Sequence, residues 1–368
     1  MATLVESASG LVAYMNYLEA SNDDWRRIGD VKANRTTARY RGYLIGRRSA
    51  GEIAASTASA RMAVVIRFYR WLSAERLLVN ESQEAEKKIL VRISDRVGAQ
   101  RSLIRTLDDL SIPNRARMRT ALEGGLHPVS AAQRDTLLAI AEARASKELY
   151  LMLALGFGTG MRLGSIADLK IKTIQLATTH PLSERICYLS IGPGVRAAPV
   201  ATKFGVTGRV VIPAHLLEKI TEYMNSMRRL RREAKASSAD RSLVFLTKNG
   251  TPYSRSGADR SSVVNVEMSR LRASAAANGH DFSGFKFHCS RATFATGIAE
   301  TAIRMGGAAG AGNAVRLVRD LLLHKNEASA LKYINFIQDQ RIKEEWSNRF
   351  TREFVGAHLC RQAGDDEC

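Results

Sequence analysis

Apolar residues recur at helical spacing along most of the chain, and they alternate or cluster in only a few short segments. The run 56–72 shows the helical pattern clearly, because it begins with capping-type residues and then places its apolar side chains near one face. That face consists of Met62, Val65, Ile66, Tyr69 and Trp71 or Leu72. The other sides carry Arg61, Arg67 and Arg70, which contact either solvent or a phosphate backbone.

The same spacing predicts helices over 81–95 and 97–110, followed by a break at Ile112-Pro113. Further along, residues 123–129 bring Gly-Gly and Pro close together, which marks a turn or a linker. We therefore expect a helical domain at 1–123, a linker at 124–129 and a second domain at 130–368.

The second domain reads as mostly helical with a small sheet near its start. Branched residues bounded by Gly and Pro predict two strands joined by a long connection, and a third short strand runs into an Asn-Gly turn. The strands are expected at 185–192, 208–213 and 243–246, and the helices at 130–144, 148–156 and 214–235. The remainder is expected to be helical except for the Gly/Ala-rich stretch 305–314, which reads as a flexible insertion. The predicted fold class is therefore mainly α with a small antiparallel sheet.

Composition excludes several classes of protein. The hydrophobic share is 45% and the charged share 25%, as in ordinary globular proteins. The longest apolar stretch, 149–157, is too short to cross a bilayer, which takes about 20 residues. The first ten residues lack the features of a signal peptide, and the four cysteines form no C-x-x-C pair. We expect a soluble, reduced, cytoplasmic protein without membrane contacts, a disulfide framework or a zinc module.

The chain is strongly basic over its whole length. It carries 55 Lys+Arg and 36 Asp+Glu, a formal net charge of +19. Residues 1–130 contain 21 basic and 14 acidic side chains, and residues 131–368 contain 34 and 22. Because both domains are positive, a polyanion is a more probable partner than a small neutral ligand.

Four short patterns carry candidate chemistry, and their order matters more than any one of them. They are Thr159-Gly-Met-Arg162 at a helix end, Lys203 between the two strands, His288-Cys-Ser-Arg291 opening a helix, and His324 followed nine residues later by Tyr333. Singly, each has a common structural explanation: a solvated arginine, an exposed lysine, a satisfied histidine or a core tyrosine. Together, in this order, they resemble the tyrosine recombinase family, which includes the phage integrases.

The resemblance covers essentially the whole chain and implies a two-domain architecture that forms a clamp on DNA. Residues 1–123 resemble the family's core-binding domain, and residues from about 129 onward resemble its mixed α+β catalytic domain. The implied partner is duplex DNA with specific recombination sites, held by a homotetramer. Arg61, Arg67, Arg70 and Arg209 are candidate DNA contacts.

The resemblance also implies a role for each motif residue. Tyr333 would attack the scissile phosphate and form a 3′-phosphotyrosyl link, while Arg162, Arg291 and His324 bind the phosphate. His288 would accept the tyrosyl proton, and Lys203 would protonate the leaving 5′-oxygen. Such chemistry uses no metal, ATP or other cofactor. For Lys203 the alternative is an exposed hairpin lysine, and the other basic residues nearby are Arg196 and Arg209.

The chain departs from the family pattern at several positions. The position three after Arg162, usually acidic, is Ser165, and Asp168 is a candidate substitute from the next turn. Ala292 follows Arg291 where histidine is frequent, and Leu323 replaces the glycine that usually precedes the second histidine. None of these changes removes a proposed catalytic residue, so activity stays the expectation.

The segment 334–368 is expected to continue as a helix with an apolar stripe. The stripe consists of Phe336, Ile337, Ile342, Trp346, Phe350 and Phe354. It packs either on the chain's own core or on a neighbouring protomer, as the C-terminal helix does in the family.

The leading function is thus a site-specific DNA recombinase associated with the bacterial nucleoid, such as an integrase, resolvase or transposase of a mobile element. Two alternatives stay open: a non-catalytic DNA-binding accessory protein on the same scaffold, and a strand transferase related to the type IB topoisomerases.

Overall fold

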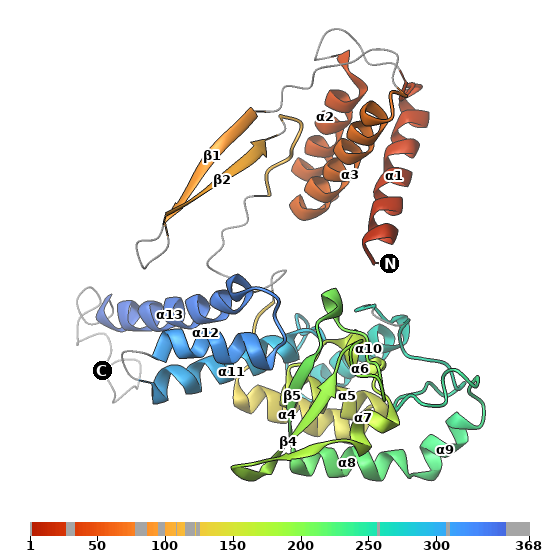
Figure 1. Ribbon diagram of the computed structural model, residues 1–368, viewed down its shortest axis with the longest axis vertical. Helices are drawn as coiled ribbons and strands as arrows, with labels where there is room; N and C mark the ends of the chain where they lie inside the picture. The colour runs from red at the N-terminus through yellow and green to blue at the C-terminus, as the bar shows by residue number, and fades with distance from the viewer. Residues whose placement is uncertain are drawn as a thin grey trace. The chain divides into compact units, whose positions relative to one another are not determined.

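The computed structural model divides into two compact units, Met1–Arg117 and Met118–Cys368. It describes residues 2–26, 34–77, 87–94, 100–107, 109–114, 122, 126–255, 258–306 and 310–350. Residues 123–125, at the start of the expected linker, lie outside the described residues, and the linker therefore stays a prediction. Figure 1 shows the elements of each unit.

The first unit is built around three helices, α1 (Ala2–Ser21), α2 (Thr36–Ser49) and α3 (Ala55–Ala74). Their shared core is rich in tyrosine: the Tyr14 and Tyr69 hydroxyls lie 2.7 Å apart, and the Tyr14 ring packs on Tyr40. Burial raises the pKa of Tyr14 and raises that of Tyr40 to about 12. Both phenols are therefore neutral at physiological pH, and the Tyr14 hydroxyl is hydrogen-bonded to that of Tyr69.

Helix α3 confirms the helix predicted over 56–72, with two differences. Its predicted apolar face is buried except for Trp71, whose side chain is 53% exposed, so that Leu72 is the core residue of the pair. The helix begins at Ala55 without a side-chain cap, so the Ser and Thr residues lie inside its first turn. Arg67 and Arg70 are exposed, as the pattern predicts.

The helices predicted over 81–95 and 97–110 are wrong. The structure places an antiparallel hairpin there, with β1 (Lys87–Ser94) paired to β2 (Gln100–Leu107). Ile89, Val91 and Ile93 alternate with other residues along β1. Alternating β-branched residues favour a strand, because their side chains are stiff and fit a pleated surface. Ile112 and Pro113 lie in irregular structure, as predicted.

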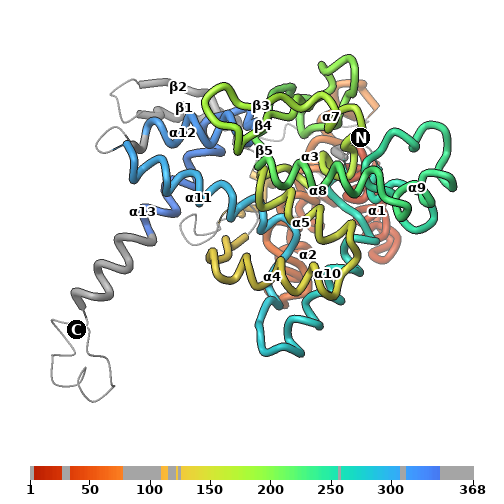
Figure 2. Tube along the Cα trace, turned by 90° about the horizontal axis from the view of Figure 1, so that it is seen from below, coloured from red at the N-terminus to blue at the C-terminus, as the bar shows by residue number. Residues whose placement is uncertain are grey.

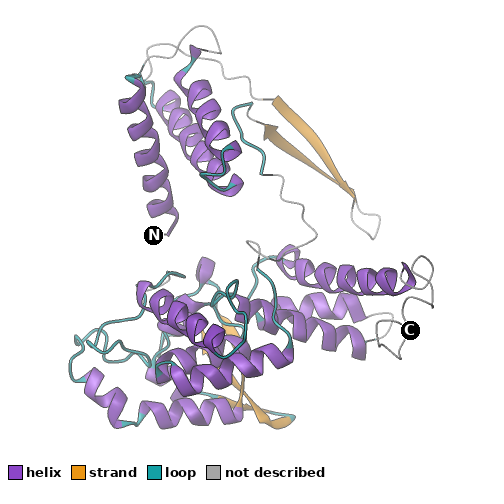
Figure 3. Ribbon diagram, turned by 180° about the vertical axis from the view of Figure 1, so that it is seen from behind, coloured by secondary structure: helices purple, strands orange, loops and turns teal. Residues whose placement is uncertain are grey.

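The second unit is mostly helical with a three-stranded antiparallel sheet, which confirms the predicted fold class (Figures 1 and 3). Its sheet has the order β3 (Thr178–His180), β4 (Ser183–Ile191) and β5 (Gly208–Pro213). The helices are α4 (Ala131–Arg144), α5 (Lys147–Thr159), α6 (Leu163–Ala167), α7 (Ile171–Gln175), α8 (Ala214–Met224), α9 (Met227–Glu233), α10 (Ser262–Ala277), α11 (Cys289–Met305), α12 (Gly310–Leu321) and α13 (Glu327–Phe350).

Helix α5 is the centre of this unit. It is buried along almost its whole length and packs against α4, α8, β5 and α11 (Figure 2). Helices α11, α12 and α13 form a group of three that pack on one another. The start of α4 is set by a capping box, in which Ser130 and Gln133 satisfy each other's backbone N–H.

Three expectations for this unit need correction. The strand expected at 243–246 is a pair of isolated bridges, from Leu243 to Lys170 and from Leu246 to Pro252. The helix expected over 214–235 is broken where Ser226 caps α9, because its hydroxyl accepts a hydrogen bond from the backbone of Arg229. Strand β3 was not predicted, since it is only three residues long.

The Gly/Ala-rich stretch 305–314 is expected to be a flexible insertion, but part of it is helical. Helix α12 begins at Gly310, within that stretch, and Ala314 is fully buried together with Val318 four residues later. A small side chain at Ala314 allows α12 to pack closely on its neighbours, so the alanine content serves helix packing. Residues 307–309 lie outside the described part of the chain.

Helix α5 ends at Gly160, which adopts the left-handed conformation with φ +67. A Cβ at this position would lie 2.5 Å from both Leu322 Cδ2 and Phe294 Cδ1. The glycine is therefore required twice, by the helix-ending conformation and by the close approach of α11 and the end of α12.

Gly160→Ala should lower the free energy of unfolding of the second unit by about 2–4 kcal/mol, from overpacking and left-handed strain combined. Urea unfolding followed by circular dichroism measures this change. Gly297→Ala is the matched control, because that glycine lies inside α11 with no atom near its would-be Cβ. The control should be neutral or stabilising by up to about 1 kcal/mol. Equal effects of the two substitutions would contradict the packing argument.

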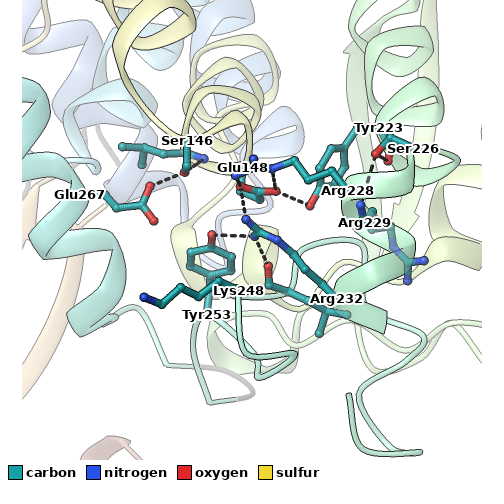
Figure 4. A network of polar contacts seen from close by, with 12 residues as sticks. Ser146, Glu148, Tyr223, Ser226, Arg228, Arg229, Arg232, Lys248, Tyr253 and Glu267 are labelled. Carbon is teal, nitrogen blue, oxygen red and sulfur yellow. Dashed lines mark hydrogen bonds and ion pairs between the residues drawn. The ribbon is translucent and has the colours of Figure 1, made fainter. Parts of the chain in front are cut away.

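A buried carboxylate organises the far end of α5 (Figure 4). Glu148 is fully buried, and its oxygens accept hydrogen bonds from Arg228 (Nε 2.7 Å, Nη2 2.8 Å) and from the Tyr223 hydroxyl (2.9 Å). Arg232 Nη2 lies 3.0 Å from the same carboxylate. Arg228 and Arg232, which both lie on α9, thus bind the same buried carboxylate.

Candidate active site

One pocket in the second unit gathers three cationic side chains. Arg162, Lys203 and Arg291 line it together with residues from the end of α5, from α6, from the β4–β5 connection and from the end of α12. No acidic side chain is among the lining residues that the structure describes. Three cations without a carboxylate make this pocket suited to an anion.

Arg162 is placed by the start of a short helix. It is the N-cap residue of α6, with extended backbone at φ −76 and ψ 152, and its side chain is half-buried. Within the described ranges its guanidinium makes no hydrogen bond or ion pair with the protein. Its N–H donors are therefore available to an anion in the pocket.

Arg291 is held in a different way. It lies on α11 with 2% of its surface exposed, and its guanidinium donates to two backbone carbonyls, Gly160 O (Nη1, 2.6 Å) and Leu322 O (Nη2, 2.9 Å). These bonds join α11 to the end of α5 and to the end of α12. Arg291 thus has a structural role in addition to lining the pocket.

Lys203 lies in the connection between β4 and β5, at the start of a single 3₁₀ turn, Lys203–Gly205. It is exposed, and its ammonium lies 5.4 Å from the centroid of the Phe204 ring. The backbone of Ala201, two residues earlier, is hydrogen-bonded to Ser165 and Asp168. The lysine therefore sits on a turn whose base is fastened to α6.

His324, which directly follows the pocket-lining residues 321–323 in sequence, stacks on Tyr333. Their ring centroids lie 6.0 Å apart with an interplanar angle of 14°, and the tyrosine is only 1% exposed. His324 follows Leu323, which has a left-handed φ of 51 where a glycine was expected from the family pattern. His324 comes two residues after Leu322, whose carbonyl accepts a hydrogen bond from Arg291. Chain connectivity thus links the pair to the pocket.

His288 occupies the N-cap position of α11 without a side-chain capping bond, three residues before Arg291, and is half-buried. It is not among the described residues that line the pocket, and neither are His324 and Tyr333. Cys289 is buried, as expected of a small core residue. The structure therefore brings Arg162, Lys203 and Arg291 into one pocket and pairs His324 with Tyr333.

The candidate DNA contacts occupy different places. Arg209 is exposed on β5, where its guanidinium lies 5.6 Å from the centroid of the Tyr188 ring. Arg61, Arg67 and Arg70 all lie on α3 in the first unit, with Arg61 half-buried. Their part in DNA binding stays a prediction.

Sequence reasoning missed the bonds that tie α6 to the β4–β5 connection. The sequence marks Ser165 as a departure from a usually acidic position and Asp168 as its candidate substitute, and the structure joins both to Ala201. A usable signal was present, because residues three apart on a helix share a face.

Comparison with protein-family models finds no match, and neither does comparison with the curated proteins. Solved structures do match. The site-specific recombinase XerH, in a post-cleavage complex with a palindromic difH substrate, superposes with a TM-score of 0.57 at 13% identity, over 94% of this chain and 80% of that one. The integrase of the transposon Tn1549, in complex with transposon right-end DNA, gives a TM-score of 0.51 at 14% identity, over 92% and 93%.

These similarities cover both units and are too broad to arise from one shared motif. The chain has the fold of these recombinases, which confirms the fold that its ordered motifs predict. No helix in the described ranges has the length and apolar character needed to cross a membrane.

Proposed function

We propose that this protein is a site-specific DNA recombinase that cuts and rejoins duplex DNA through a 3′-phosphotyrosyl intermediate. The observation that carries the proposal is the pocket, in which Arg162, Lys203 and Arg291 converge without an acidic neighbour among the described lining. A phosphodiester undergoing in-line attack accumulates negative charge on its non-bridging oxygens, and fixed cations stabilise that charge. The similarity to recombinase structures supports the same reaction class.

Each candidate residue has one role in the proposed reaction. The Tyr333 oxygen attacks the scissile phosphorus as its proton passes to His288, and the bond from phosphorus to the 5′-oxygen breaks. Lys203 gives a proton to that leaving oxygen. Arg162 and Arg291 bind the non-bridging oxygens through their N–H donors, with His324 as a further donor. Attack by a 5′-hydroxyl from a second strand reverses the step and restores the phosphodiester.

Tyr333 is buried in this state, with 1% of its surface exposed. Attack on a phosphate in the pocket therefore requires its hydroxyl to become accessible when DNA binds. The helix that carries it, α13, is described as far as Phe350, and residues 351–368 lie outside the described part of the chain. We propose that this C-terminal segment docks on a neighbouring protomer in a tetramer at paired sites in cytoplasmic DNA.

Covalent capture tests the proposal. DNA fragments retained by the protein are sequenced to find its site, and a duplex with that site is nicked so that religation is impossible. Wild-type protein should then give an adduct that survives SDS and is destroyed by protease. No adduct on a site that the protein binds specifically would overturn the recombinase proposal in favour of an accessory DNA-binding role. Relaxation of supercoiled plasmid without site dependence would indicate a topoisomerase instead.

A further inference from the structure

We propose that Ser165 and Asp168 are positioning residues for Lys203, which they place by holding both backbone groups of Ala201. The proposal rests on the proposed function, because it assumes that Lys203 protonates the leaving oxygen. It assigns a purpose to Ser165, which stands where the family pattern is usually acidic, and to Asp168, the candidate substitute from the next turn.

The backbone N–H and C=O of Ala201 are both hydrogen-bonded to side chains of α6 and its C-cap residue. The Ser165 hydroxyl donates to the carbonyl of Ala201 at 2.8 Å, and the backbone N–H of Ala201 donates to Asp168 Oδ2 at 2.7 Å. A residue held at its N–H and its C=O together cannot rotate without breaking a bond. Ala201 precedes Lys203 by two residues, so the grip fixes the point from which the lysine-bearing turn starts.

The anchoring carboxylate is itself held. Asp168 Oδ1 lies 2.6 Å from the ammonium of Lys170, so each carboxylate oxygen has its own partner. Asp168 and Ser165 are both buried, at 9% and 7% exposure. A hydrogen bond from a backbone N–H to a charged carboxylate is roughly twice as strong as a neutral one, and burial shields it from water.

The same short helix sets the position of Arg162. Arg162 is the N-cap of α6, and Asp168 is its C-cap. The backbone bonds of α6 therefore connect an arginine of the pocket with the residues that anchor the lysine loop. We infer that α6 acts as a spacer, which keeps the phosphate-binding guanidinium and the proton-donating ammonium at a constant separation across the pocket.

The rest of the turn is closed by its own bonds. The Thr202 hydroxyl donates to Val206 O at 2.6 Å, and the Gly205 N–H donates to Thr202 O at 3.1 Å. The turn thus moves as one piece, and its orientation depends on the attachment at Ala201. A proton donor must lie within hydrogen-bond reach of the leaving oxygen, so a loosened attachment reduces catalysis even though Lys203 itself is unchanged.

A leaving group that needs no proton separates positioning from a merely structural role. In DNA whose scissile 5′-bridging oxygen is replaced by sulfur, the leaving thiolate departs without a general acid, because a thiol is far more acidic than an alcohol. Loss of a proton donor, or of its placement, is therefore rescued by the sulfur substrate. General damage to the pocket is not.

The experiment measures the rate of adduct formation on oxygen and sulfur versions of the nicked site for wild type, Lys203→Ala, Ser165→Ala and Asp168→Ala. On the oxygen substrate we expect losses of about 100-fold or more for Lys203→Ala and of about 10–100-fold for Asp168→Ala, with a smaller loss for Ser165→Ala. On the sulfur substrate all three should return to within about threefold of wild type.

Asp259→Ala is the matched control. Asp259 Oδ1 accepts a hydrogen bond from the backbone N–H of Gly164, so its removal loosens the N-terminal end of α6, beside Arg162, and leaves the bonds of Ser165 and Asp168 to Ala201 in place. Any rate loss in this variant should be equal on the two substrates. Thermal unfolding of each variant, followed by circular dichroism, monitors the fold.

The outcomes separate the two proposals. If Lys203→Ala is rescued by sulfur and Asp168→Ala and Ser165→Ala are not, the positioning role is overturned while the recombinase mechanism stands. If Asp168→Ala and Ser165→Ala retain wild-type rates on the oxygen substrate, the positioning role is likewise overturned. If wild type forms no adduct with either substrate, the proposed function fails, and the positioning role fails with it.

Discussion

Replacing Tyr333 by phenylalanine should abolish the covalent protein–DNA adduct, with a loss of at least about 1,000-fold in the rate of cleavage. The substitution removes the proposed nucleophilic oxygen and leaves the ring, which stacks on His324 and is almost fully buried. Packing in α13 is therefore retained, and site-specific DNA binding should be close to that of wild type. Denaturing electrophoresis of the nicked substrate measures the adduct, and a mobility shift measures binding.

Tyr188→Phe provides the comparison. Tyr188 lies on β4 in the same unit, half-exposed beside Arg209, and it has no part in the proposed chemistry. This variant should form the adduct at the wild-type rate. An adduct that persists in Tyr333→Phe would assign the nucleophile to another residue, which peptide mapping of the adduct would identify.

Glu148→Ala should lower the free energy of unfolding of the second unit by about 3–5 kcal/mol, the usual cost of removing one partner from a buried ion pair. The substitution leaves the guanidinium of Arg232 and the hydroxyl of Tyr223 without the acceptor that they share. It also leaves a cavity beside α5, which is buried along almost its whole length. Urea unfolding in neutral buffer measures the change.

Glu142→Ala is the control, since that carboxylate is half-exposed and lies 3.7 Å from Lys219 in a surface ion pair. Its removal should cost less than about 1 kcal/mol. Comparable losses in the two variants would contradict the importance of the buried network.

The network also predicts a pH dependence. Burial by itself raises the pKa of Glu148, but the hydrogen bond from Arg228 and the charge of Arg232 outweigh it, so the folded-state pKa lies below the ordinary value of 4.5. Because the folded pKa is the lower one, the contribution to stability is complete above pH 4.5 and is lost as the pH falls below it. The difference in stability between wild type and Glu148→Ala should therefore shrink in acid. A difference that stays constant from neutral pH to pH 3 would contradict the assignment.

Sequence periodicity predicted the elements that a single amphipathic or branched pattern defines, such as α3, α4, β4 and β5. It failed where two patterns compete over a short span. In residues 87–107 the apolar positions satisfied a loose helical spacing, while the alternation of Ile89, Val91 and Ile93 favoured the observed hairpin. It also failed at 243–246, where the strand-like residues make only isolated bridges because their neighbours are irregular segments.

The candidate site was also predictable only in part: its motif residues could be found from the sequence, and their bonding partners could not. Short motifs indicated Arg162, Arg291 and His324 because each is recognisable within a few residues. The partners of these groups come from distant parts of the chain: Arg291 bonds to Gly160, and Ser165 bonds to Ala201 across a helix and two strands. No local pattern specifies such pairs, so the bonds that position the site were accessible only from the folded chain.

The net charge likewise does not show which basic residues are available to bind phosphate. The run of arginines 228–232 looks like a surface for DNA, yet Arg228 and Arg232 are joined to Glu148, and Arg229 bonds to Glu233 and to two backbone carbonyls. Most of that run therefore stabilises the fold. A positive charge on DNA-binding proteins overstates the number of groups that are available to phosphate.

The carbonyl bonds of Arg291 have a consequence for judging which relatives of this protein are active. A descendant that had lost its chemistry would still need Arg291 to join α11 to the ends of α5 and α12, so selection for a stable fold alone would preserve it. Within the described structure, the Arg162 side chain makes no comparable bond that joins elements of the fold. Under the proposed function, the arginine at position 162 is therefore the more sensitive indicator of retained DNA cleavage among homologous sequences, and the arginine at 291 the poorer one.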